Sequence, residues 1–172
     1  MKRRASRRAP ARLRKAGSRR GSSAAQRSRV SRSGPRRSEV AISPQRLMAE
    51  AQRARHLAYA PYSRFAVGAA LLTASGRVFH GCNVENASFG LTTCAERTAV
   101  FNAVTEGERE FSAIAVTARE GHGAPPCGSC RQVLQEFAPQ MWVYWRDGRG
   151  RIQKSQLKSL LPNAFVLKRV GG

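Results

Sequence analysis

The chain carries the sequence TCAER at residues 93–97 and PPCGSCR at residues 125–131, and both stretches strongly constrain how the rest of it can fold. After the first, small apolar residues recur at helical spacing until Gly107, and after the second Pro126 opens a similar helical pattern. The apolar residues 111–118 between them have the composition of a buried strand. We therefore predict that each stretch begins a helix and that a strand separates the two helices.

Outward from these stretches, helical and strand patterns alternate along the chain. Ser43 and Pro44 form an N-cap followed by proline at the first helical position, which predicts a helix that ends before Pro61. Turns at Ser75-Gly76 and Asp147-Gly148 join strand-like segments into hairpins. Strands are predicted at residues 65–73, 77–84, 111–118 and 141–145, with a further strand after residue 148. A short last helix is predicted near residues 157–161. This order predicts an α/β fold with a single mixed sheet and helices on its faces.

The first part of the chain differs in composition from the remainder. Residues 1–38 hold 15 of the 31 basic residues and no acidic residue, which leaves 16 basic against 10 acidic residues in the rest. This segment has few large apolar side chains, so it cannot bury enough surface to offset the entropy of ordering. We expect a disordered basic tail at residues 1–40 and one folded domain at residues 41–172.

The role of the tail stays open at this level. Its Arg-rich and Ser-rich composition suits an organelle transit peptide, an arm for nonspecific nucleic-acid contact, or a stretch upstream of the true start at Val30 or Val40. No apolar run approaches the roughly 20 residues that span a bilayer, and the N-terminus lacks the apolar core of a secretory signal. We expect a soluble, cytoplasmic protein that does not contact membranes, with organelle import as the alternative.

Three cysteines lie at the two predicted helix starts: Cys94, Cys127 and Cys130. Free backbone N–H groups and the helix dipole lower the pKa of a cysteine at such positions and so favour the thiolate. Three protein ligands are typical of a catalytic zinc, whose open position holds a water. Glu96 lies two residues after Cys94, where its carboxylate can approach that water without binding the metal. The pattern predicts a Zn²⁺ site with Glu96 as the proton carrier.

Simpler interpretations exist for several of these residues. Glu96 follows Thr93 at the spacing of a helix capping box. Cys82 fits a small buried strand residue and is excluded from the metal site. Three histidines, at no recognisable ligand spacing, are interpreted as ordinary surface or packing residues: His56, His80 and His122. Without further context, the arginines next to the cysteine stretches would be solvated helix charges, namely Arg97 and Arg131.

The two cysteine stretches match a known catalytic signature, in which His/Cys-x-Glu is followed by Pro-Cys-x-x-Cys, as in zinc deaminases. Residues 43–165 resemble the small homotetrameric cytidine deaminases, which act on free cytidine and deoxycytidine. Besides the cysteine stretches, the supporting sequences are FAVGAA, GCNVENA and LLPNAF at residues 65–70, 81–87 and 160–165. The resemblance implies a cytidine deaminase-like three-layer α-β-α sandwich with one mixed five-stranded sheet, a bound Zn²⁺ and a homotetramer.

The same resemblance assigns substrate contacts. Asn83 and Glu85 are expected to hydrogen-bond the ribose, with Glu85 at the 3′-hydroxyl. Phe65 is expected to pack near the nucleoside. The backbone around Ala95 and the Glu96 carboxylate are expected to read the edge of the pyrimidine. The bound molecule is thus a small nucleoside.

Two further roles concern the metal and the neighbouring subunit. Three thiolates make a zinc cluster negative, which weakens its power to acidify water unless nearby donors withdraw charge. The resemblance implies that Arg97 bonds to these thiolates. It also implies that Phe165 reaches the base in a site formed largely by another subunit, which makes oligomerisation part of the site.

The predicted reaction is hydrolytic deamination of cytidine and deoxycytidine to uridine and deoxyuridine with release of ammonia, a step of pyrimidine salvage. Three rivals remain. A deaminase of a related aminopyrimidine such as blasticidin S is disfavoured by the ribose-type residues 83–87. A nucleic-acid editing deaminase fits the basic tail, but such enzymes typically have histidine as the first ligand. A noncatalytic zinc-stabilised module is disfavoured by Glu96 and by the presence of only three ligands.

Overall fold

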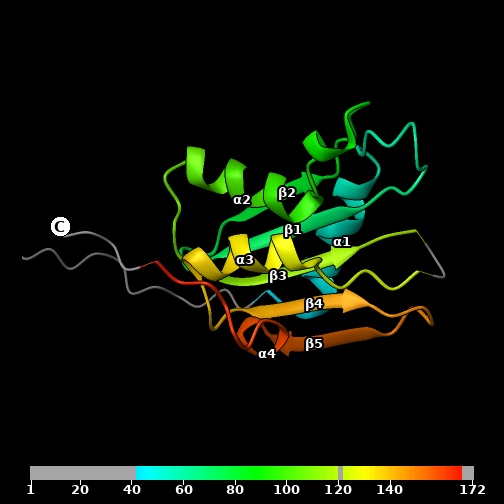
Figure 1. Ribbon diagram of the computed structural model, residues 1–172. Helices are drawn as coiled ribbons and strands as arrows, with labels where there is room; N and C mark the ends of the chain where they lie inside the picture. Colours follow the sequence, from blue (N-terminus) through cyan, green and yellow to red (C-terminus); the bar gives the residue numbers. More distant parts are fainter. Residues whose placement is uncertain (1–41, 120–121, 168–172) are drawn as a thin grey trace, which may run out of the picture. The chain divides into compact units, whose positions relative to one another are not determined.

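The centre of the fold is a five-stranded sheet in the order β2-β1-β3-β4-β5 (Figure 1). The computed structural model describes residues 42–119 and 122–167. Its strands are β1 Gly68–Thr73, β2 Val78–Cys82, β3 Phe111–Thr117, β4 Trp142–Arg146 and β5 Ile152–Gln156. All neighbouring strands are antiparallel except β3 and β4, which are parallel. The predicted single mixed sheet is confirmed.

Helices cover both faces of this sheet. They are α1 Pro44–Arg55, the 3₁₀ helix η1 Phe89–Leu91, α2 Ala95–Thr105, α3 Gly128–Phe137 and α4 Leu157–Leu160. On one face, Leu47 and Met48 of α1 pack with Ala70 and Ala113 of the sheet. On the other face, α2, α3 and α4 pack with the alternate strand residues, such as Ile114. Figure 1 shows α2 and α3 in front of the sheet and α1 behind it, so the predicted three-layer sandwich is confirmed.

Two glycines let helices approach the sheet closely. A Cβ atom at Gly68 would overlap the backbone of α1 at Ala51, and a Cβ atom at Gly81 would overlap the backbone of α2 at Ala95. A larger residue at either place would push the helix away from its strand. Gly81 therefore fixes how near the first turn of α2 lies to β2.

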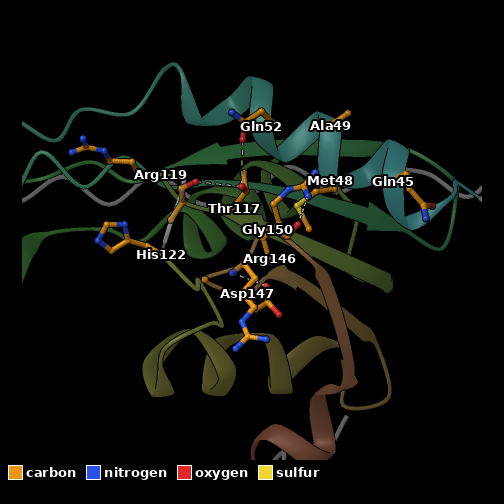
Figure 2. Close-up of a pocket in the computed structure, with 13 residues that line it drawn as sticks. Gln45, Met48, Ala49, Gln52, Thr117, Arg119, His122, Arg146, Asp147 and Gly150 are labelled. Carbon is orange, nitrogen blue, oxygen red and sulfur yellow. Dashed lines mark hydrogen bonds between the residues drawn. The ribbon is translucent and has the colours of Figure 1, made fainter.

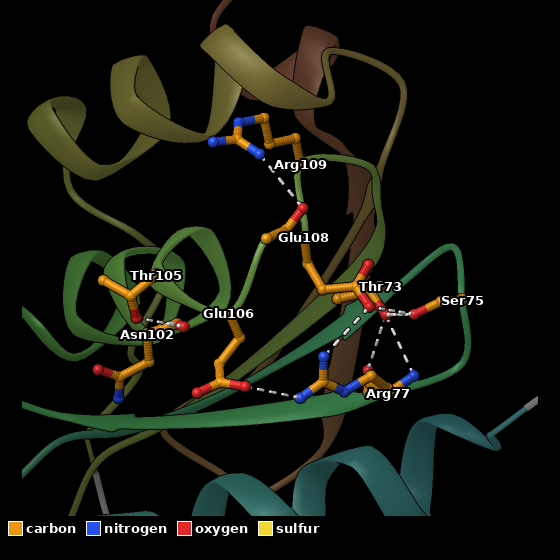
Figure 3. A network of polar contacts seen from close by, with 9 residues as sticks. Thr73, Ser75, Arg77, Asn102, Thr105, Glu106, Glu108 and Arg109 are labelled. Carbon is orange, nitrogen blue, oxygen red and sulfur yellow. Dashed lines mark hydrogen bonds and ion pairs between the residues drawn. The ribbon is translucent and has the colours of Figure 1, made fainter.

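A polar network closes one end of the sheet (Figure 3). Ser75 in the β1–β2 turn donates to Glu108 at 2.6 Å, and Arg77 donates to Glu106 at 3.3 Å. These contacts tie the turn to the segment that follows α2. Because both arginine and carboxylates are solvated, such pairs contribute little to stability. The network marks the end of the sheet where β3 begins, and the cysteines lie at the opposite end.

The element boundaries differ from the predictions in a few places. β1, β2 and β3 are shorter than predicted at the ends nearest the cysteines, whereas β4 begins and ends one residue later than predicted. The 3₁₀ helix η1 was not predicted from the sequence. The third helix begins at Gly128 rather than Pro126, because Cys127 is its N-cap. Within residues 42–119 and 122–167, no helix has both the length and the apolar character needed to cross a membrane. The predicted tail at residues 1–40 lies outside the described residues.

Candidate active site

Backbone hydrogen bonds on both sides of Cys94 hold it at the start of α2. Just before it, Thr93 and Val84 exchange backbone hydrogen bonds of 2.9 and 3.0 Å. Just after it, the Cys94 carbonyl accepts the first hydrogen bond of α2, from the N–H of Thr98 at 3.1 Å. The half-buried thiol is therefore placed by the fold and not by a flexible loop.

Cys127 and Cys130 are placed by the start of α3. Cys127 is the exposed N-cap and Cys130 is a fully buried residue of the first turn. The three Sγ atoms of Cys94, Cys127 and Cys130 lie within 4.8 Å of one another. Zinc–sulfur bonds of about 2.3 Å in a tetrahedral site separate the sulfurs by about 3.8 Å, so these sulfurs need little movement to share one ion. The donor set fits zinc.

Cys82 does not join this cluster. Its Sγ donates a hydrogen bond to the carbonyl of Leu57 at 3.3 Å. Burial raises the pKa of the Cys82 thiol, which makes it a poor ligand. All four cysteines are free thiols in this structure.

The electrostatics of the cluster favour a thiolate at Cys94. A hydrogen bond from Cys130, together with the hydrogen bond and positive charge of Arg97, lowers the pKa of the Cys94 thiol to about 5. The Nη2 atom of Arg97 lies 3.8 Å from the Cys94 sulfur and also donates to the Thr92 carbonyl at 2.8 Å. Arg97 is thus fixed against a metal-ligand candidate, as the resemblance implies.

Glu96 is a buried carboxyl group next to the cysteine cluster. It lies in the first turn of α2 and is only 5% exposed. Burial raises the pKa of Glu96, and the nearby charge of Cys94 adds to this effect, against an opposing backbone hydrogen bond. A carboxyl group whose pKa is raised holds its proton more readily than a solvated one, so it can donate a proton as well as accept one.

The capping box predicted from Thr93 and Glu96 is wrong. The N-cap of α2 is Cys94, so Glu96 occupies the second helical position and not the third. Thr93 cannot enter the helix because its backbone pairs with Val84. The structure thus removes the simpler interpretation of Glu96 and leaves its carboxylate to line a cavity.

That cavity brings together most of the predicted site residues. Its volume is about 330 Å³, within the range of ligand pockets. The predicted residues that line it are Phe65, Asn83, Glu85, Cys94, Ala95, Glu96 and Cys127. Val116 at the end of β3 and the loop residues 123–125 complete the wall. Residues distant in sequence therefore converge on one hollow.

Asn83 and Glu85 line the cavity while also holding its wall in place. The Asn83 side chain accepts from the N–H of Val67 at 2.8 Å and donates to the carbonyl of Phe65 at 2.9 Å. The Glu85 carboxylate accepts from the N–H groups of Tyr62 and Ser63 at 2.8 and 3.2 Å and from the Ser63 hydroxyl. These bonds, led by that of the Ser63 hydroxyl, lower the pKa of Glu85.

Among the predicted substrate contacts, Phe165 is the residue that does not line this cavity. It is 73% exposed, beyond the end of α4. Its backbone makes two hydrogen bonds with the side chain of Gln132 in α3. Its ring therefore lies outside the cavity that holds the other predicted substrate contacts.

Sequence reasoning missed several residues that shape the site. Arg131 is not a solvated helix charge, because it donates to the carbonyl of Pro126 at 2.7 Å and to the carbonyl of Leu160 at 2.9 Å. No local sequence pattern indicated these two contacts. His122 packs edge-on against Phe65 with ring centroids 5.6 Å apart. No local pattern indicated that contact.

A larger cavity, of about 650 Å³, lies beside α1 (Figure 2). Its walls come from α1, the end of β3 and the β4–β5 turn. Its one acidic side chain, Asp147, is engaged by the backbone N–H groups of Arg149 and Arg151. Among its lining residues there is neither a thiol nor a buried carboxylate. Size alone therefore does not make it the catalytic candidate.

Comparison with known proteins bears directly on this site. The family described as cytidine and deoxycytidylate deaminase zinc-binding region matches residues 42–146. The cytidine deaminase of Sporosarcina psychrophila is 49% identical over 116 residues, which cover 67% of this chain and 85% of that protein. The cytidine deaminase of Halalkalibacterium halodurans is 54% identical over 117 residues, which cover 67% of this chain and 89% of that protein.

Solved structures agree. The crystal structure of cytidine deaminase from Burkholderia pseudomallei is 50% identical with a TM-score of 0.69, covering 72% of this chain and 100% of that chain. The crystal structure of cytidine deaminase from Mycobacterium tuberculosis is 43% identical with a TM-score of 0.65, and the match covers 73% of this chain and 99% of that chain. Fold and thiol cluster together thus define a zinc-binding deaminase. Within this class, the chain belongs to the cytidine and deoxycytidylate deaminase family, and its cofactor is zinc.

Proposed function

We propose that this chain catalyses the hydrolytic deamination of free cytidine and deoxycytidine to uridine and deoxyuridine with release of ammonia. The observation that carries the proposal is a buried carboxyl group, Glu96, in a cavity beside three sulfur atoms within 4.8 Å of one another. The relatives named cytidine deaminase, at about half identity, support it over deamination of blasticidin S or of nucleic acid.

The metal and Glu96 divide the chemistry between them. Zinc held by Cys94, Cys127 and Cys130 supplies, when bound, the Lewis acidity that makes water a nucleophile near neutral pH. Glu96 removes a proton from the attacking water and passes it to N3 of the pyrimidine. It then takes the remaining proton of the hydroxyl that has added to C4 and delivers it to the leaving amine, so that ammonia departs and the C4 carbonyl forms. Its raised pKa suits this repeated exchange. Arg97 withdraws negative charge from the sulfur cluster.

The substrate contacts extend this proposal to the cavity wall. Asn83 uses one donor and one acceptor of its amide on Phe65 and Val67, which leaves its second N–H to hydrogen-bond a ribose hydroxyl. The Glu85 carboxylate has lone pairs beyond those used by residues 62–63, so it also has capacity for the 3′-hydroxyl. The backbone of Ala95 reads the pyrimidine edge.

The larger organisation belongs to the same proposal. We place the deaminase domain at residues 41–172, with a basic tail at residues 1–40 that suits nonspecific nucleic-acid contact. Phe165, exposed and outside its own cavity, packs on the base in a neighbouring subunit of a homotetramer. The reaction serves pyrimidine salvage in the cytoplasm, with organelle import through the tail as the alternative.

The test is an ultraviolet assay of the zinc-loaded protein with cytidine and deoxycytidine. Parallel reactions contain blasticidin S and a single-stranded DNA rich in cytosine. We expect turnover of both nucleosides, and much slower turnover of the other two substrates. Faster deamination of blasticidin S or of the DNA than of free cytidine would assign the site to the corresponding rival.

A further inference from the structure

Phe165 combines an exposed ring with a fixed backbone. The residue is 73% exposed. Its N–H donates to Oε1 of Gln132 at 3.3 Å, and its carbonyl accepts from Nε2 of Gln132 at 2.8 Å. In residues 42–119 and 122–167, no aromatic or cationic side chain stacks on the Phe165 ring. The chain thus orders the backbone of an aromatic residue whose ring stacks on no side chain in the described part of the chain.

A second anchor holds the other end of the same segment. Arg131, the residue before Gln132, donates from Nη1 to the carbonyl of Leu160 at 2.9 Å. Through Nε it also donates to the carbonyl of Pro126, directly before Cys127, at 2.7 Å. Two consecutive residues of α3 therefore fasten residues 160–165 to the helix start that carries Cys127 and Cys130.

These anchors reduce the conformational entropy of the segment that carries Phe165. Residues 161–165 have no regular secondary structure of their own, so without anchors the ring would sample many positions. An amide that satisfies both backbone groups of one residue acts like a neighbouring strand. Fixing a ring before it binds removes part of the entropy lost on binding, which strengthens the contact that the ring makes.

We propose that Gln132 is the positioning residue for Phe165: its side-chain amide holds the Phe165 backbone so that the ring is presented to the nucleoside bound by a second copy of the chain. This inference rests on the proposed function, in which Phe165 packs on that base. Gln132 does not line the cavity and is not one of the three candidate metal ligands. It acts by fixing the position of the Phe165 ring.

The first experiment uses Gln132→Glu, which keeps the size and the acceptor of the side chain but replaces its donor with a charge that repels the Phe165 carbonyl. Gln132→Met removes both hydrogen bonds without adding charge. Gln140→Glu makes the same chemical change at an exposed residue with no hydrogen bond in the described structure and serves as the control. Both Gln132 variants should raise KM for cytidine roughly tenfold, with kcat and zinc content nearly unchanged. The control should match wild type.

A double-mutant cycle with Phe165→Ala separates positioning from general structural support. Once the ring is absent, Gln132→Glu should have no further effect on KM. An unchanged KM in both Gln132 variants, an effect that adds fully to that of Phe165→Ala, or a loss of zinc in both variants would each overturn the inference.

Hydrogen exchange gives a readout that needs no substrate. The Phe165 amide should exchange more slowly in wild type than in an unstructured peptide, and Gln132→Met should accelerate it at least several-fold. Exchange at the unstructured rate in wild type would refute the positioning role directly. If the wild-type protein failed to deaminate cytidine, the proposed function would fail, and this measurement would still decide whether Gln132 holds Phe165.

Discussion

A carboxyl group buried beside sulfur ligands is useful for catalysis only if its proton can come and go. Glu96 meets this requirement because burial raises its pKa. The structure also shows that it does not cap the helix, since Cys94 is the N-cap. Its position in the first turn of α2 is therefore best explained by proton transfer.

Replacement of Glu96 tests this at the scale of one residue. Glu96→Gln should keep the fold and one zinc per subunit, because the amide has nearly the same shape as the carboxyl group. It should lose roughly a hundred- to ten-thousand-fold in kcat, the usual contribution of a positioned acid or base. Steady-state kinetics with zinc analysis measure both effects. Glu106→Gln, at the exposed end of the same helix, is the matched control, and near-normal turnover by Glu96→Gln would remove the residue from the mechanism.

The ligand assignment can be tested with two cysteines. Cys127→Ala should lose bound zinc, because it removes one of three thiolates whose sulfurs lie within 4.8 Å of one another. Cys82→Ala should retain full zinc content, because Cys82 donates its hydrogen bond to Leu57 away from the cluster. Metal analysis after dialysis gives the result. Stoichiometric zinc in Cys127→Ala, or zinc loss in Cys82→Ala, contradicts the assignment.

At the scale of elements, local patterns predicted helices and strands well, and long-range pairing explains what they missed. Ser43 does cap α1, by accepting from the N–H of Arg46 at 3.3 Å. Thr93 resembled an N-cap, but its pairing with Val84, nine residues earlier, holds it outside the helix. The cysteines and Glu96 were predicted because spacing along a helix carries their signal. The contact of Glu85 with residues 62–63 has no such signal, since it joins segments more than 20 residues apart.

Two glycines allow the placement of α2 to be tested separately from that of α1. Gly81→Ala should push α2 from β2, and Gly68→Ala should push α1 from β1, since in each case the added Cβ meets helix backbone. Each overpacking should cost about 1–3 kcal/mol in urea unfolding. Only Gly81→Ala should also lower turnover per folded molecule, because Cys94 is the N-cap of α2 and Glu96 lies in its first turn. Equal losses of turnover in the two variants would show that the spacing of α2 does not control the site.

At the scale of the whole molecule, the proposed homotetramer brings Phe165, which is exposed and does not line its own cavity, to the nucleoside of a neighbouring subunit. Two impaired variants can then complement each other. Glu96→Gln retains Phe165, and Phe165→Ala retains Glu96, so hybrid oligomers contain some sites with both residues intact. Coexpressed variants should be more active per subunit than the average of the two separate proteins. Activity equal to that average would show that each subunit's site is complete without its neighbour.

The charge distribution leads to the last prediction, since 15 basic residues fall within residues 1–38, outside every residue proposed to bind zinc or nucleoside. Attraction to phosphates should belong to the tail, and it should weaken steeply with salt because bound phosphates release counterions. Removal of residues 1–40 should therefore abolish binding to single-stranded DNA. Cytidine turnover should survive at both low and high salt, because a neutral nucleoside gains little from distant charge. Loss of cytidine turnover in a folded, zinc-loaded truncated protein would instead make the tail part of the catalytic site.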